Sequence, residues 1–360
     1  MPELSVNKSE NLKIMKKSLL LLAVILFTLC NNTFAAPLKQ GDGKYLITTT
    51  QQLNDPVYAQ KIEDFYATGE EGTFTGKNDV PIYYKIFRQP GKEKGAILIS
   101  SGRTEGALKY KEVIYDLFNN GYSVYIHDHR GQGLSGRMAK DPEMGYVDNF
   151  QYYIDDMKYF YDTYLKPDKH QKIFLLSHSL GGAIAMSYLE QYPGDFDAAS
   201  FSSPMLGLAS YICPLAHILY TKTPKYAPGQ TGYHRDSSSF ATNSVTGSEV
   251  RFHRATEAYR LQPEARLGGA TVQWLKESCD HMKAVSKNIS KIETPFILFA
   301  AENETVVNHK TETKFVAKAQ KLGKDCNIFP IGDAQHELLM EKDPQRTDVM
   351  TKTLDFFGKY

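Results

Sequence analysis

Lys172-Ile-Phe-Leu-Leu-Ser-His-Ser-Leu-Gly-Gly-Ala-Ile-Ala185 joins an apolar run to a run of small residues. The apolar part, Ile173–Leu176, is typical of a buried parallel strand, and the small residues after it predict the start of a helix. Between them lies Ser177-His-Ser-Leu-Gly181, a variant of the G-x-S-x-G nucleophile elbow with serine in place of the first glycine. Such a turn needs small flanking residues because strand and helix pass close together. The stretch therefore predicts that Ser179 is presented as a nucleophile at the edge of a sheet.

The chain on both sides of this stretch alternates short apolar runs with longer amphipathic segments. We expect strands at 72–75, 82–87, 95–100, 123–127, 198–202, 296–300 and 327–331, with helices between most of them. This alternation predicts an α/β fold with a mostly parallel central sheet flanked by helices on both faces. In such a sheet, functional residues gather at the carboxyl ends of the strands.

The alternation breaks between Pro204 and Ile292, where an apolar segment at 206–220 and a Gly/Ser/Thr-rich stretch at 226–246 precede two predicted helices. A long insertion between strands is typical of a lid, and we expect this one to be mainly helical. Its apolar face is either an acyl channel or a small separate core. The predicted organisation is an upstream extension and signal peptide at 1–35, a first core part at 36–203, the lid at 204–292 and a second core part at 293–360.

The first residues have the pattern of an export signal. Met15-Lys-Lys-Ser18 precedes the apolar run Leu19–Leu29, which is too short to span a membrane, and small residues follow. We expect translation to start at Met15 and cleavage after Ala35. Lipidation at Cys30 and an uncleaved anchor are the alternatives. The pattern predicts a periplasmic or secreted protein, and membrane association is compatible with it.

Composition restricts the partners. The 42 basic and 41 acidic residues give a net charge of +1, so neither a nucleic-acid partner nor electrostatic attraction to anionic lipid is expected. Contact with a membrane or micelle would have to be apolar. Export would place Cys213, Cys279 and Cys326 in an oxidising compartment, with at most one internal disulfide. The alternatives are a bridge between Cys213 and Cys279 or three free thiols, and the oligomeric state is not predicted.

A nucleophilic serine needs a histidine base and an acid that orients it, in the chain order serine, acid, histidine on this architecture. His336 follows the last predicted strand in a loop just before the last helix, so we expect it to be the base. The acid should follow the strand at 296–300. Glu304 and Glu302 compete for this role, with Asp333 as a more distant candidate, and the position in the loop favours Glu304.

Two backbone amides are expected to form an oxyanion hole, namely those of Leu180 and of Arg103 in the loop Ser101-Gly-Arg-Thr-Glu-Gly106. The loop Asp128-His-Arg-Gly-Gln-Gly-Leu-Ser135 follows the next strand. No helix begins directly after its glycines, so we interpret it as a structural loop rather than a phosphate cradle. We expect Asp128 and Arg130 to pair within it.

These motifs resemble those of the serine-dependent α/β-hydrolases of the monoacylglycerol lipase and lysophospholipase group, over residues 70–357. The resemblance rests on the stretches 101–110, 128–137, 177–181, 268–278 and 334–343. It implies the α/β-hydrolase fold with an inserted helical lid, and it places the acid at Glu304. It also implies that Ser179 and His336 hydrolyse a single-chain lipid ester, a lysophospholipid or monoacylglycerol, through an acyl-enzyme. No metal or cofactor motif is present, and the expected partner is a small lipid or ester substrate.

Other functions remain compatible with the same residues. The alternatives are a broad carboxylesterase, a serine aminopeptidase of the same fold, and a catalytically silent binding protein. Three arginines of the insertion, Arg251, Arg254 and Arg266, are candidates for contact with a phosphate headgroup, and solvated surface charge is the competing interpretation of each.

Overall fold

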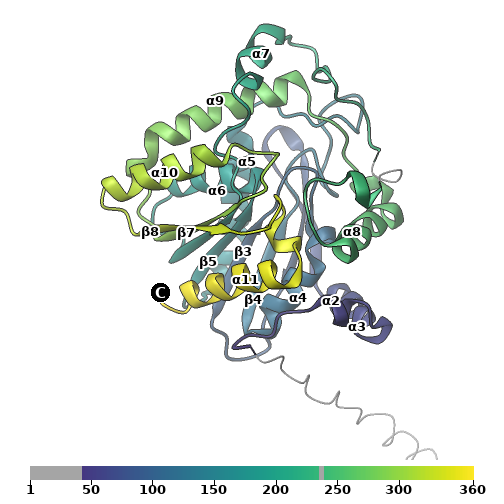
Figure 1. The fold of residues 1–360 in the computed structure, drawn as a ribbon, viewed down its shortest axis with the longest axis vertical. Helices are drawn as coiled ribbons and strands as arrows, with labels where there is room; N and C mark the ends of the chain where they lie inside the picture. Colours follow the sequence, from purple (N-terminus) through teal and green to yellow (C-terminus); the bar gives the residue numbers. More distant parts are fainter. Residues whose placement is uncertain (1–42, 235–238) are drawn as a thin grey trace, which may run out of the picture. The chain divides into compact units, whose positions relative to one another are not determined.

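An eight-stranded sheet in the order β1-β2-β4-β3-β5-β6-β7-β8 forms the centre of the structure (Figure 1). The strands are β1 (Glu70–Thr75), β2 (Pro81–Phe87), β3 (Gly95–Ser100), β4 (Tyr122–His127), β5 (Ile173–His178), β6 (Ala198–Ser202), β7 (Phe296–Ala301) and β8 (Cys326–Ile331). Strands β3 to β8 pair in parallel, whereas β1 and β2 add an antiparallel edge. The prediction of a mostly parallel sheet is confirmed.

The structure, a computed structural model, describes residues 43–234 and 239–360. The predicted signal segment, with Met15, Cys30 and Ala35, lies outside the described residues. Within the described ranges, no helix combines the length and the apolar character needed to cross a membrane.

Helices cover both faces of the sheet (Figure 1). On one face lie α5 (Gln151–Phe160), α6 (Leu180–Gln191), α9 (Val272–Asn288) and α10 (His309–Lys321), and on the other lie α4 (Lys111–Asn119) and α11 (Asp343–Phe357). The described helices also include α2 (Thr50–Leu53), α3 (Pro56–Ala67), α7 (Ile212–Leu219) and α8 (Glu249–Leu261). The apolar side chains of the two faces form separate buried clusters, because the sheet divides them.

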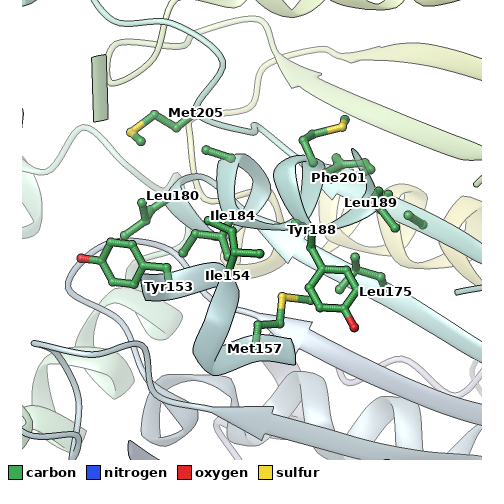
Figure 2. Packing of buried hydrophobic residues seen from close by; sticks show 14 of the residues in the cluster. Tyr153, Ile154, Met157, Leu175, Leu180, Ile184, Tyr188, Leu189, Phe201 and Met205 are labelled. Carbon is green, nitrogen blue, oxygen red and sulfur yellow. The ribbon is translucent and has the colours of Figure 1, made fainter. Parts of the chain in front are cut away.

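Close packing of α6 on the sheet sets the position of the turn that precedes it. Figure 2 shows Ile154 and Met157 of α5 beside Ile184 and Tyr188 of α6, and all four side chains are buried. A Cβ atom at Gly181 would lie 2.1 Å from the carbonyl oxygen of Ser100, so helix and strand meet in backbone contact there. Only glycine fits at this position. The first turn of α6 is therefore held rigidly against the end of β3.

The segment between β6 and β7 holds α7, α8 and α9. Helix α9 contributes Trp274, Met282 and Val285 to the same buried cluster as α6, so this part of the insertion belongs to the helical layer of the core. A disulfide between Cys213 and Cys279 ties α7 to α9, which confirms that pairing, and Cys326 is free and buried. The boundaries of the lid stay a prediction.

Candidate active site

Ser179 lies in the sharp turn between β5 and α6. Its φ of 51° and ψ of −119° are unfavourable for any residue other than glycine, as a nucleophile elbow requires. The backbone is held on both sides: its N–H donates to the carbonyl of Ser202 (3.1 Å), and its carbonyl accepts from the N–H of Met205 (2.8 Å). The hydroxyl therefore stands at the N-terminus of α6, where the helix dipole favours negative charge.

The structure brings Ser179, His336 and Glu304 together from three separate loops. The distance between His336 Nε2 and Ser179 Oγ is 2.9 Å, and that between His336 Nδ1 and Glu304 Oε2 is 2.7 Å. His336 lies in the loop after β8, and Glu304 lies in the loop after β7. Nucleophile, base and orienting acid thus form a continuous hydrogen-bonded chain, which is the arrangement that activates a serine.

The surroundings of Glu304 favour its charged form. Burial raises the pKa of this carboxyl group, but the hydrogen bond and charge of His336 outweigh that effect, and the backbone amides of Val306 and Val307 assist. The net pKa lies below the usual value. The competing candidates lie elsewhere: Glu302 is exposed, and Asp333 is exposed and paired with Lys342.

The loop after β3 and the start of α6 hold the two predicted oxyanion donors. Leu180 is the first residue of α6 and is buried. The loop that carries Arg103 is anchored because the N–H of Gly102 donates to Glu105 Oε2 at 2.6 Å. That the amides of Arg103 and Leu180 hold an oxyanion stays a prediction.

A buried charge network behind the site was missed from the sequence. Lys109 Nζ lies 2.7 Å from Glu105 Oε1 and 2.6 Å from Glu337 Oε1, and Tyr110 donates to Glu105 Oε2 at 2.7 Å. Burial raises the pKa of Glu105, but the charge of Lys109 overrides it, so the net pKa is well below normal. The network joins the Arg103 loop to the residue after His336. The four-residue spacing of Glu105 and Lys109 was the one available signal.

The expected pair of Asp128 and Arg130 is wrong. Asp128 accepts from the backbone amides of Ala107 and Leu134, both at 2.7 Å, and burial raises its pKa to about 6. Arg130 instead makes a two-pronged contact with Asp156 of α5, at 2.7 Å for each nitrogen. Backbone amides occupy the carboxylate of Asp128, and the guanidinium of Arg130 binds the carboxylate of Asp156 and the carbonyl of Lys77.

A cavity of about 320 Å³ opens on Ser179. Its walls are mostly apolar side chains, including Leu215 and Leu219 of α7, Trp274 of α9 and Val306. Among the described residues that line it, Arg103 is the one with a charged side chain. The arrangement suits a ligand with a long apolar part, because that part is removed from water against α7 and α9.

The three insertion arginines lie outside this cavity. Arg251 is buried and pairs with Glu112 and Asp343, each at 2.9 Å, so neither interpretation proposed for it holds. Arg254 pairs with Glu63 at 3.2 Å, and Arg266 donates to the carbonyl of Tyr259. In residues 43–234 and 239–360, no three His, Cys, Asp or Glu side chains converge as metal ligands would.

Comparison with known proteins places the chain among serine hydrolases. The family model described as serine aminopeptidase, S33, matches residues 91–343. The chain is 34% identical to lysophospholipase L2 of Escherichia coli (strain K12), over 83% of this chain and 90% of that protein. It is 23% identical to human monoglyceride lipase, over 74% of this chain and 83% of the relative.

Solved structures share the fold. A soluble variant of the monoglyceride lipase from Saccharomyces cerevisiae superposes with a TM-score of 0.64 at 18% identity, covering 81% of this chain and 95% of that chain. The monoacylglycerol lipase of Paleococcus ferrophilus gives a TM-score of 0.60 at 20% identity, over 77% of this chain and 98% of that chain. The α/β-hydrolase fold expected from the sequence is confirmed.

Proposed function

The chain belongs to the serine aminopeptidase S33 family of hydrolases, and from this premise we propose that it is a carboxylic ester hydrolase of single-chain lipids, lysophospholipids or monoacylglycerols. The observation that carries the proposal is the apolar cavity that opens on a serine hydroxyl hydrogen-bonded to a histidine. The kinship to lysophospholipase L2 and to monoglyceride lipase supports the same substrate class.

The reaction follows from the positions of the three side chains. Ser179 Oγ attacks the ester carbonyl while His336 Nε2 takes the hydroxyl proton, and the charge of Glu304 stabilises the resulting imidazolium. The amides of Arg103 and Leu180 hold the oxyanion of the tetrahedral intermediate. His336 then gives its proton to the leaving alcohol oxygen, and an acyl-enzyme remains. Water, deprotonated by His336, attacks this ester, the bond to Ser179 Oγ breaks, His336 returns the proton to that oxygen, and the fatty acid is released.

The cavity favours an ester lipid over a peptide with a free amino terminus. An aminopeptidase needs acidic groups that hold the substrate ammonium group. Among the described residues that line the cavity none is acidic, and Arg103 would repel a cation. A second candidate function, as an aminopeptidase, therefore has no support from the lining residues.

Helix α7 supports transient contact with a lipid surface. Tyr211, just before the helix, is 69% exposed and Ile218 is 79% exposed, although both are large and apolar. Residues on the same helix line the cavity on Ser179, so a lipid leaving a membrane or micelle would meet the cavity directly. The near-neutral composition makes this contact apolar.

Export is part of the same proposal. The charged and apolar pattern of residues 15–36 supports a cleaved signal, and the disulfide between Cys213 and Cys279 supports an oxidising compartment. Mass measurement of the protein recovered from the cell envelope and medium tests this. A mature chain that begins at Ala36 is expected, and a cytoplasmic protein with an intact amino terminus would contradict it.

The decisive test of the activity is hydrolysis of a substrate panel: fatty-acid release from lysophospholipids and monoacylglycerols, p-nitrophenol release from short p-nitrophenyl esters, and amine release from aminoacyl amides. We expect the lipid esters to have the highest kcat/KM. Faster cleavage of the amides would overturn the proposal, and so would the absence of any hydrolysis.

A further inference from the structure

The side chain of Arg103 occupies a defined place in the cavity on Ser179. Its Nη2 donates to the carbonyl of Gly268 at 2.7 Å, and its guanidinium lies 5.2 Å from the centre of the Trp274 ring. Trp274 is itself fixed, because its indole N–H donates to the hydroxyl of Tyr153. The guanidinium is therefore held by a carbonyl and an aromatic face in a position where it borders the space that Ser179 serves.

The space for this guanidinium depends on a glycine. A Cβ atom at Gly145 would lie 2.5 Å from Arg103 Nη2, and it would also lie 3.0 Å from the carbonyl oxygen of Gly269. Any larger residue at position 145 would have to displace the guanidinium. The location of this positive charge is thus built into the surrounding backbone as well as into residue 103.

From this geometry we propose that the Arg103 side chain selects substrates with a phosphate in the headgroup, so that lysophospholipids are preferred over monoacylglycerols. The inference rests on the proposed function, because it concerns what the same cavity accepts. A lysophospholipid carries its acyl ester and its phosphate on one glycerol. A cation that borders the cavity of the nucleophile can therefore meet the phosphate while Ser179 attacks the ester.

The two candidate substrates share the acyl chain and differ in the headgroup. The acyl chain of either lipid lies along the apolar walls from α7 and α9. A guanidinium matches phosphate oxygens with parallel N–H donors and stays charged at any relevant pH. A monoacylglycerol offers only neutral hydroxyl groups there, which gain far less from a cation. Arg251, Arg254 and Arg266 do not line the cavity, so this selection falls to Arg103.

The test compares two substrates with the same acyl chain, 1-oleoyl lysophosphatidylglycerol and 1-oleoyl glycerol, in mixed micelles of neutral detergent at equal mole fraction. The measured quantity is the ratio of their kcat/KM values. This ratio cancels any general loss from movement of the loop after β3. We expect Arg103→Met to lower it about tenfold to a hundredfold, because a charge-assisted hydrogen bond is lost, and Arg103→Lys to lower it less.

Two further variants make the result specific. Gly145→Ala leaves residue 103 intact but displaces its guanidinium, so we expect it to lower the ratio in the same direction. Arg254→Met removes one positive charge outside the cavity and is expected to leave the ratio unchanged. Thermal unfolding of each variant verifies that it is folded.

The outcomes separate this inference from the proposed function. If the wild-type protein hydrolyses both lipids but Arg103→Met leaves the ratio unchanged, the selection is contradicted and the esterase activity stands. An equal fall in the ratio for Arg254→Met would also contradict it, because net charge would then be the cause. If the wild-type protein hydrolyses neither lipid, the proposed function itself fails.

Discussion

Two cavities of this protein differ in chemistry more than in size. The cavity on Ser179 measures about 320 Å³ and has mostly apolar walls, and the Ser179 hydroxyl that lines it is hydrogen-bonded to His336. The other measures about 480 Å³ and lies between α3, α4 and α8, lined by Glu63, Lys111, Glu112, Arg251 and Arg254 among others.

The charged side chains that line the larger cavity form ion pairs with one another. Glu63 pairs with both Lys111 and Arg254, and Glu112 pairs with Arg251. Such pairs hold α8 to α3 and α4, whereas the smaller cavity brings together groups that can move a proton. Volume therefore does not identify the active site, whereas the convergence of nucleophile, base and apolar wall does.

The largest effect should come from the nucleophile. Ser179→Ala removes the attacking oxygen, and we expect kcat for lipid esters to fall by about 10⁴-fold or more. The matched change in the larger cavity, Lys111→Met, should leave kcat and KM within about twofold, because a surface ion pair contributes little. Steady-state fatty-acid release measures both. A comparable loss in the two variants would erase the distinction between the cavities.

The next effect concerns the acid. Glu304→Ala should lower kcat by about 10³-fold or more, since His336 loses the group that fixes its tautomer and stabilises its charge. Glu302→Ala, two residues away and exposed, is the matched control and should be close to the wild type. Parallel kcat measurements decide between them. The reverse order would assign the acid to Glu302.

Lys109 lines the larger cavity, but its ion pair with Glu337 lies next to His336 of the smaller one, so this residue connects the two regions. Lys109→Met leaves the buried carboxylates of Glu105 and Glu337 without their shared cation. We expect stability to fall by about 3–5 kcal/mol. We also expect kcat to fall up to about a hundredfold with little change in KM, because misplacement of the reacting groups slows chemistry more than binding.

Urea unfolding and steady-state kinetics measure these two effects of Lys109→Met. Lys109→Arg keeps the charge and should recover much of the lost kcat. A variant that loses stability but keeps the wild-type kcat would show that the network supports the fold and does not position the site.

The smallest effect on kcat is expected for a buried carboxyl group near Glu304, which acts on stability instead. Glu312 is fully buried, and its oxygens have no hydrogen-bond partner among the described residues. Burial, and secondarily the charge of Glu304, raise its pKa from 4.5 to about 9. Between these values the unfolded chain releases a proton that the folded protein keeps, so this group makes stability fall as pH rises.

Glu312→Gln removes this dependence. The free energy of unfolding of variant and wild type is measured with urea at pH 5 and pH 8.5. The value for the variant minus that for the wild type should be larger at pH 8.5 than at pH 5. Parallel pH profiles of the variant and the wild type would contradict the raised pKa, and kcat should change little in either case.

The predictable features are those that short patterns and chain order determine. Strand β5, the turn at Ser179 and the loops of Glu304 and His336 follow from apolar runs that end in polar residues, because parallel strands bring their carboxyl ends to one edge. The α/β arrangement follows from the same alternation.

The features that the sequence did not reveal are contacts between distant residues. Arg130 pairs with Asp156 and not with Asp128, because backbone amides donate to the carboxylate of Asp128. Arg251 is buried through a partner 139 positions away in the chain, Glu112, and nothing in the periodicity of α8 indicates it. The walls of the cavity likewise combine side chains of α7 and α9 with Val306 from the loop after β7, and the order of the elements along the chain does not show that these meet at Ser179.

The most direct measurement is labelling with a fluorophosphonate, followed by peptide mass spectrometry. A serine that is hydrogen-bonded to His336 inside an apolar cavity should react with the probe in seconds to minutes and carry a single adduct. We predict that the adduct maps to Ser179 and that Ser179→Ala abolishes it. An adduct on another residue, or no labelling of the folded wild-type protein, would contradict the assignment of this cavity as the active site.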